Sequence, residues 1–575
     1  MNKILTKIFM LLAVAVCGGA LLASCYDDKG GNDYDTQLAD VEIYIPESAY
    51  GAPLGELISI TPTVKTTIAE EDLQYIWEVK GSSEDDFGHR SYKPLVNEEE
   101  QGKVLNYTTH LDENITALNA SYDCRLHVRQ ISTGRDFYSK NTFTITVSGK
   151  TGLMLLYGDN EGSDVGIFQS FDFMPSTMTV PAADNASPAL FSMSNGGKLL
   201  EGKGKHIEQI TGLYFSTYAS YPGYDVIFGP RCGQVFTQTD KTAIWLKKEG
   251  LDTYGEWNSF FYLKGKDAVN KNQPRGILVG LLYVWGFDGG DVFSYSAGSS
   301  FPFLFAETTT NDALTQDGNK CSFTGQSLAN GTSSGFLYTE SVNGENKKGF
   351  VTFSLNPGYL KSTGRLLDTK DDVVPFNPGN THADLVKMKM DSRSHLMAVM
   401  KGDATHPTLA GKYFTIDVNP AGKALPDTKT AYSGMPAYQY DLSAMPNINS
   451  AVAFEFGSTQ NMCYYATPSA VYQYRLDAGV ASAAEPLTMI DATPWSPQGE
   501  VTMMKFLDNE AMTTPTHTSD KVLMVAVWQG GKAALWSLHM DIASGRIKSA
   551  KKFDESNVAG WNFNKPILDA SIKNM

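Results

Sequence analysis

Residues 521–541 read KVLMVAVWQGGKAALWSLHMD and contain the pattern that recurs through most of the chain. An apolar run at 521–528 is followed by Gln-Gly-Gly and then by an alternating run, 534–541, that ends in aspartate. Short apolar runs separated by glycine and polar residues are typical of β-strands joined by tight turns. The stretch therefore predicts an antiparallel β-hairpin.

The same order of apolar run, polar turn and alternating run returns at 395–417 and 451–477, with weaker copies at 153–168 and 276–285. Repeats every ~40–70 residues without amphipathic helices favour radially arranged sheets. We therefore predict an all-β chain in which residues 149–575 form a β-propeller-like domain of about seven blades. Residues 561–568 are expected to close the ring against 153–157. Two stacked β-sandwich domains are the alternative.

Residues 38–148 are predicted to form a separate, smaller β-sandwich. The run 73–79 alternates apolar and polar residues and places Trp77 on the apolar face. Further along, Tyr122 precedes Cys124 by two residues. A tryptophan in a central strand and a tyrosine at this spacing from a cysteine are typical of immunoglobulin-like sandwiches.

The first 25 residues determine the predicted compartment. Lys3 and Lys7 precede an apolar run at 8–16, and the segment ends in Leu-Ala-Ser-Cys25. This order is typical of a secretory signal, and the apolar run is shorter than a membrane-spanning helix requires. The ending is similar to a bacterial lipobox. It predicts a signal peptide at 1–24 and a lipid on Cys25.

A polar, glycine-containing tether follows at 25–37. It begins Cys-Tyr-Asp-Asp-Lys-Gly, and Asp27, Asp28 and Lys29 resemble the acidic signal that exports lipoproteins to the cell surface. With the sandwich features, this start is similar to the PKD-like family of Bacteroidetes lipoproteins, with Gly31 as an inserted residue. The resemblance implies a protein anchored in the outer membrane beside a SusC/SusD-type importer.

Composition excludes some partners. The chain has 47 basic and 63 acidic residues and a net charge of −16. This balance argues against nucleic acid, whose phosphates need a basic surface. The cysteines beyond the lipobox are widely separated, so they predict isolated thiols rather than a disulfide framework or zinc site: Cys124, Cys232, Cys321 and Cys463. No cofactor or metal is expected.

Catalytic motifs are almost absent. The nine histidines include no HExxH pair, and no catalytic residue is predicted. We expect a non-catalytic protein that binds a glycan or peptide for uptake. A surface glycoside hydrolase or lyase is the alternative from the enzyme class, because propeller enzymes assemble sites from distant loops. A purely structural accessory subunit is the third possibility.

Aromatic residues outside the strand patterns are the candidate ligand contacts. Trp495 lies between two prolines, Trp257 follows a Gly-Glu pair, and Tyr221 and Tyr224 flank a Pro-Gly turn. Flat aromatic faces with polar edges stack well on sugars and extended peptides. The alternative role for each of them is packing between neighbouring sheets.

Overall fold

The computed structural model describes most of the chain between residues 41 and 573. The described residues are 41–84, 90–116, 118, 120–176, 178–209, 235–256, 276–279, 283–288, 291–296, 321–330, 334–354, 365–367, 376–390, 395–418, 437–457, 461–477, 479–507, 516–518 and 521–573. Their regular structure is almost all β-strand, with one five-residue α-helix, α2 (Leu190–Ser194), and short 3-10 helices. The predicted all-β class is therefore confirmed.

The first part is a β-sandwich. Its strands are β1 (Glu42–Tyr44), β2 (Ala49–Pro53), β3 (Leu57–Ile60), β4 (Thr63–Lys65), β5 (Leu73–Glu84), β6 (Arg90–Pro94), β7 (Leu105–Thr108), β8 (Ser121–Gln130), β9 (Asp136–Tyr138) and β10 (Phe143–Ser148). The largest sheet has the order β2-β10-β8-β5-β6, with β9 beside β8. Two smaller sheets pair β1 with β4 and β3 with β7.

Trp77 lies at the centre of the sandwich, as the alternating pattern predicted. It is fully buried, and its ring packs edge-on against Phe143 at 5.9 Å between centroids. The indole Nε1 donates to Gly102 O at 2.8 Å, and the backbone N–H donates to the Gln101 side chain. The hydrogen bond satisfies the polar edge of a ring that is otherwise surrounded by apolar side chains.

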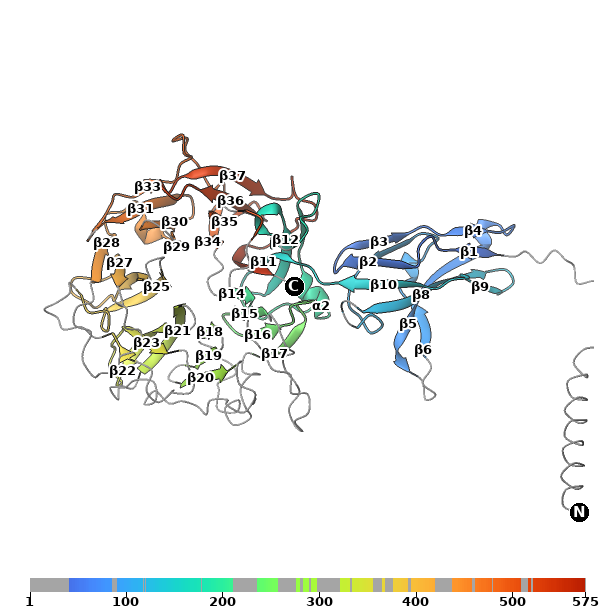
Figure 1. Ribbon diagram of the computed structural model, residues 1–575, viewed down its shortest axis with the longest axis horizontal. Coiled ribbons are helices and arrows are strands. Elements are labelled where there is room, and N and C mark those ends of the chain that lie inside the picture. The colour runs from blue at the N-terminus through green and yellow to red at the C-terminus, as the bar shows by residue number, and fades with distance from the viewer. Residues whose placement is uncertain are drawn as a thin grey trace, which may run out of the picture.

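The remaining strands form seven further sheets in the described part of the chain, and Figure 1 shows them following one another around a ring. The first sheet contains β11 (Gly152–Gly158), β12 (Ser163–Gln169), β13 (Asn185–Ser187) and β38 (Ile567–Lys573). The second contains β14 (Gly204–Gln209), β15 (Val235–Thr239), β16 (Ala243–Leu246) and β17 (Thr253–Glu256). The third contains β18 (Gly276–Val279), β19 (Tyr283–Asp288) and β20 (Asp291–Ser296).

The other four sheets continue in chain order. The fourth sheet contains β21 (Cys321–Asn330), β22 (Ser334–Val342), β23 (Phe350–Ser354) and β24 (Arg365–Leu366), and the fifth contains β25 (Ala383–Met390), β26 (Leu396–Gly402), β27 (Tyr413–Val418) and β28 (Ala437–Asp441). The sixth contains β29 (Ala453–Phe456), β30 (Met462–Ala466), β31 (Val471–Asp477), β32 (Val480–Ala481) and β33 (Glu485–Pro486). The seventh contains β34 (Glu500–Phe506), β35 (Lys521–Gln529), β36 (Lys532–Met540) and β37 (Ile547–Phe553).

Each sheet turns one strand toward the middle of the ring (Figure 1), and a series of contacts links these inner strands from β18 to β14. Strand β18 contacts β21, β21 contacts β25, β25 contacts β29, and β29 contacts β34. Strand β38 lies between β34 and β14 and contacts both. The inner strands therefore bring together residues that are far apart in the sequence.

The two ends of this part of the chain meet in one sheet. Strand β38 pairs antiparallel with β11, with Ile572 opposite Leu153 and Ile567 opposite Tyr157. The pairing of the C-terminal stretch with 153–157 is thus confirmed, but the strand lies at Ile567–Lys573 instead of 561–568. Trp561 and Phe563 precede it as core residues instead. Trp561 Nε1 donates to Ala533 O at 2.8 Å.

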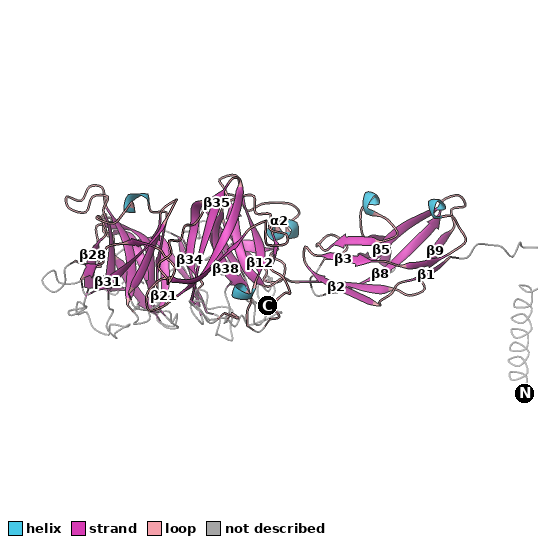
Figure 2. Cartoon of the chain, turned by 90° about the horizontal axis from the view of Figure 1, so that it is seen from above, coloured by secondary structure: helices cyan, strands magenta, loops and turns pink. Residues whose placement is uncertain are grey.

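One hydrophobic cluster extends from the sandwich into the first two sheets of the ring. Leu54 of the sandwich and Leu190 of α2 belong to the same buried cluster, and Gly55 lies directly against Leu190. Buried Lys150 links the two parts, because its ammonium lies 2.7 Å from Glu56 of the sandwich and 2.5 Å from Ser187 Oγ of the ring. Figure 2 shows the sandwich extending from the α2 side of the ring.

Helix α2 is held in place by the first sheet of the ring. The Tyr157 hydroxyl accepts a hydrogen bond from Ala189 N at 2.9 Å, and Ala189 has the left-handed φ of 61°. Asp164 Oδ1 accepts from Ser192 N at 3.1 Å. These contacts fix the start of the helix on which the sandwich packs.

Replacing Tyr157 by phenylalanine should lower the free energy of unfolding by about 1–2 kcal/mol, because Ala189 N–H loses its acceptor. Chemical denaturation of the purified protein measures the change. Tyr75→Phe is the matched control. The Tyr75 hydroxyl donates to the exposed Glu70 carboxylate, and water can replace this donor when the hydroxyl is removed. An equal, small effect of both changes would show that the hydrogen bond does not hold α2.

Candidate functional site

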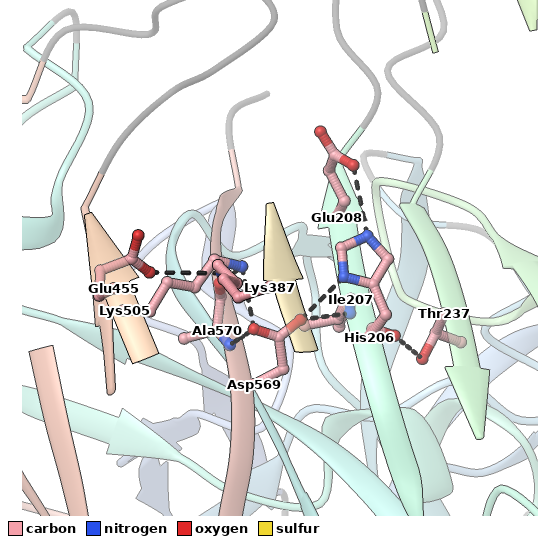
Figure 3. Close-up of polar contacts among 9 residues, drawn as sticks. All are labelled: His206, Ile207, Glu208, Thr237, Lys387, Glu455, Lys505, Asp569 and Ala570. Carbon is pink, nitrogen blue, oxygen red and sulfur yellow. Dashed lines mark hydrogen bonds and ion pairs between the residues drawn. The ribbon is translucent and has the colours of Figure 1, made fainter. Parts of the chain in front are cut away.

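A group of charged side chains comes together on inner strands of the ring (Figure 3). Asp569 on β38 lies at its centre and is nearly buried. Its Oδ1 accepts from Lys505 Nζ at 2.9 Å and from Ala570 N at 2.8 Å. Its Oδ2 accepts from Ile207 N at 2.9 Å and lies 3.0 Å from His206 Nδ1. One carboxylate therefore joins β38 to both β34 and β14.

His206 on β14 lies between two carboxylates. Its Nδ1 faces Asp569, and its Nε2 lies 3.4 Å from Glu208 Oε2. Burial by itself lowers the pKa of His206, but Asp569 and Glu208 outweigh this effect and raise it to about 9. The imidazole is therefore protonated at neutral pH, with both nitrogens acting as donors.

Asp569 stays ionised in the same arrangement. Burial acts to raise its pKa, but the Lys505 ammonium and protonated His206 outweigh burial and hold the pKa well below its usual range. A carboxylate that binds protons so weakly cannot act as a general acid near neutral pH. Its chemistry here is that of a hydrogen-bond acceptor and counter-ion.

A second group of charges lies on β25 and β29. Glu455 on β29 is only 2% exposed, and two lysines of β25 approach it. Lys387 Nζ lies 3.4 Å from Glu455 Oε2, and Lys389 Nζ lies 3.6 Å from Oε1. Glu455 Oε1 also accepts from Phe456 N at 3.1 Å. Figure 3 shows Lys387 and Glu455 in the same view as Asp569 and His206.

Elsewhere in the described residues, a serine, a histidine and an aspartate lie close together but do not have the arrangement of a catalytic triad. Ser537 Oγ donates to Asp172 Oδ2 at 2.7 Å, and His539 Nε2 lies 3.0 Å from the same oxygen. Both side chains contact the carboxylate, whereas a catalytic triad needs the serine to contact the histidine. The described residues also contain no group of three or more side chains that could hold a metal ion.

Of the predicted ligand contacts, only Trp495 lies within the described residues. Its ring packs edge-on against Trp536 at 5.5 Å between centroids, and its indole Nε1 is buried without a hydrogen-bond partner in the described part of the chain. Trp536 Nε1 donates to Pro497 O. The structure thus places the half-buried Trp495 ring against Trp536.

The other predicted site residues lie outside the described residues: Cys25, Asp27, Asp28, Lys29, Tyr221, Tyr224 and Trp257. Three of the four other cysteines, Cys124, Cys321 and Cys463, are buried free thiols, as predicted. Cys232 lies outside the described residues. In the part of the chain that is described, no helix combines the length and apolar character needed to cross a bilayer.

Sequence reasoning missed the charged group. His206 and Glu208 are two residues apart, so on a strand their side chains share one face, which is a local signal for a shared environment. Asp569 lies 363 residues from His206, and Lys505 lies on a different strand from either. Only the meeting of β14, β34 and β38 makes these residues neighbours.

The fold and this site define an all-β protein with a sandwich and a ring of sheets whose inner strands carry paired charges. Comparison with known families places a PKD-like family domain at residues 25–202. The matched range continues past the sandwich through β11, β12, β13 and α2. A search of curated proteins found no match.

Proposed function

We propose that the seven sheets are the blades of a β-propeller. Three observations support this arrangement: the sheets follow the chain order, their inner strands contact one another, and β38 completes the sheet of β11. Pairing of the last strand with the first sheet closes a propeller without leaving a free end. Two stacked sandwiches would instead bury whole sheet faces against each other.

We also propose that the chain is an outer-membrane lipoprotein, exposed at the cell surface and anchored through Cys25. The signal-like segment at 1–24 and its Leu-Ala-Ser-Cys25 ending carry this proposal, and the position of the sandwich fits it. Strand β1, the first strand of the sandwich, lies at the end opposite the ring (Figures 1 and 2). At about 3.3 Å per residue, a strand as long as β8 spans about 33 Å. A lipid before residue 41 would therefore hold the ring away from the membrane.

The proposed role of the ring is to bind a glycan or peptide, without catalysis, for a SusC/SusD-type importer. Side chains on the inner strands form ion pairs with one another, and a polar surface of this kind fits a binding role. The resemblance to PKD-like lipoproteins supports the importer as partner. A glycoside hydrolase or lyase is the competing proposal. Steady product release by the purified protein from a polysaccharide library would favour the enzyme.

Replacing Cys25 by alanine should move the protein from the membrane to the soluble fraction, because the acyl chains supply the anchoring free energy. Fractionation of cells expressing the full chain measures this shift. Cys17→Ala is the matched control and should leave the protein in the membrane. Retention of the Cys25→Ala protein in the membrane would contradict the lipid anchor.

A further inference from the structure

The outer face of the largest sheet of the sandwich carries a salt bridge between neighbouring strands. Trp77 on β5 and Leu126 on β8 point into the core and are fully buried. Successive residues of a strand face opposite ways, so Glu78 and Arg125 point outward. They lie opposite each other in the register of the sheet, and Arg125 Nε donates to Glu78 Oε2 at 2.6 Å. The salt bridge is therefore built into the pairing of the two strands.

The Arg125 guanidinium lies over two tyrosine rings. Its Cζ is 3.9 Å from the ring centroid of Tyr92 on β6 and 4.3 Å from that of Tyr138 on β9. Both distances are well within the range of about 6 Å over which a cation is attracted to an aromatic ring. His127 stacks on Tyr138 at 4.7 Å between centroids, and its Nδ1 lies 3.3 Å from Glu78 Oε1. These contacts restrict the orientation of the guanidinium.

The Nη atoms of Arg125 are the unused part of this arrangement. A guanidinium has five N–H donors, and among the described residues only the Nε donor of Arg125 has an acceptor. The side chain is 27% exposed, so it is not sealed from solvent. Both oxygens of Glu78 are already engaged, one by Arg125 and one by His127. The two Nη groups therefore form a fixed fork of donors, which matches both oxygens of a carboxylate.

Tyr138 supplies an aromatic surface beside these donors. It is 46% exposed, so its ring can stack on a flat ligand. In a uronic acid the carboxylate is bonded directly to the sugar ring, which keeps the two at a short, fixed separation. The Arg125 guanidinium and the Tyr138 ring are likewise held close together. An acidic peptide side chain instead joins its carboxylate to the backbone through flexible methylenes, and ordering them on binding costs free energy.

We infer that Arg125 and Tyr138 form a binding site for a uronic acid residue of a glycan. The Nη groups of Arg125 hold the carboxylate, and the Tyr138 ring stacks on the sugar ring. The site lies on the sandwich, apart from the inner strands, so the inference goes beyond the proposed binding role of the ring. The chain as a whole carries a charge of −16, so general electrostatic attraction does not account for binding of an anion.

Isothermal titration of the mature full-length protein tests the inference, with trigalacturonate and trimannuronate as uronate probes. Their methyl esters keep the sugar rings without the charge, and triglutamate supplies carboxylates without a sugar. We expect at least one uronate probe to bind, its ester to bind about tenfold more weakly, and triglutamate not to bind. Failure of both uronate probes overturns the inference, as does equal binding of the ester. Binding of triglutamate as tightly as the uronates would overturn the assignment to a sugar.

Replacing Arg125 by lysine should weaken binding of the uronate probe about tenfold, because the charge remains but the fork that matches both carboxylate oxygens is lost. Arg135→Lys is the matched control. The Arg135 guanidinium also lies over a ring of the sandwich, at 5.1 Å from the centroid of Phe137, and this change should leave binding unchanged. Equal losses for both variants would reject Arg125 as the group that holds the carboxylate.

The stacking role of Tyr138 is tested with two variants. Tyr138→Ala removes the ring and should weaken binding of the uronate probe about fivefold, whereas Tyr138→Phe keeps the ring and should bind like the parent. Tyr44→Ala removes another exposed tyrosine of the sandwich and is the control. Equal losses for Tyr138→Ala and Tyr138→Phe would contradict stacking. Uronate binding that the Arg125 and Tyr138 variants all retain would reject this site and leave the proposed role of the ring standing.

Discussion

Replacing Asp569 by alanine should lower the free energy of unfolding by about 3–5 kcal/mol, the usual cost of removing one partner from a buried ion pair. The change leaves Lys505 and protonated His206 without the carboxylate between them. It also removes the acceptor for the backbone N–H groups of Ile207 and Ala570. Denaturant unfolding at neutral pH measures the loss.

Asp184→Ala is the control for this change. Asp184 pairs at 2.5 Å with Lys551, and it likewise joins segments from the two ends of the ring. Lys551 is largely exposed, so water can replace the pair, and the expected loss is below about 1 kcal/mol. Similar losses for the two alanine variants would show that Asp569 contributes no more than a surface pair.

Replacing Lys573 by methionine should stabilise the protein by about 2–3 kcal/mol at pH 6. Lys573 is fully buried, and its ammonium donates to Lys150 O. Burial lowers the pKa of Lys573 to about 7, against the attraction of Glu249. Each pKa unit corresponds to about 1.4 kcal/mol, and the lost hydrogen bond offsets part of the gain.

The lowered pKa of Lys573 determines how the stabilisation by the methionine variant changes with pH. Below pH 7 both the folded and the unfolded chain hold Lys573 protonated, and the folded chain bears the full cost of burying the charge. Between pH 7 and 10.5 the unfolded chain binds more protons at this residue, so this contribution to stability rises with pH. The advantage of the methionine variant should therefore shrink across that range and disappear near its upper end.

His206 acts in the opposite direction. Its raised pKa contributes stability that is complete below its usual pKa of 6.5 and is lost as the pH rises through about 9. The effect of Lys573 is therefore measured as the difference between variant and parent at each pH. Lys198→Met, at an exposed position, is the control and should show a constant difference. A constant difference for Lys573→Met as well would contradict the lowered pKa.

Local patterns predicted the sandwich strand around 73–79 and the 521–541 hairpin. Period-two alternation identified the strand around Trp77, because one face of that strand is buried. The turn at Gly530 and Gly531 followed from two glycines, and both adopt a positive φ in the structure. Each of these features depends on residues within a few positions of one another.

The charged inner strands could not be predicted in the same way. Their contacts depend on which strands become neighbours in the ring, and no local pattern connects His206 with Asp569. Trp495 shows the same dependence on the fold: its position between prolines gave no sign that Trp536 lies beside it and packs against it. The composition of a loop does not distinguish an aromatic side chain that faces solvent from one that packs against the protein.

The junction at Lys150 determines how a pulling force would reach the ring. In a chain anchored at Cys25, tension passes through the sandwich and enters the ring at the start of β11. This strand is hydrogen-bonded on one side to β12 and on the other to β38. Force along β11 loads both ladders in shear, so many hydrogen bonds share it at once. The last strand of the ring thus reinforces the strand through which the load arrives.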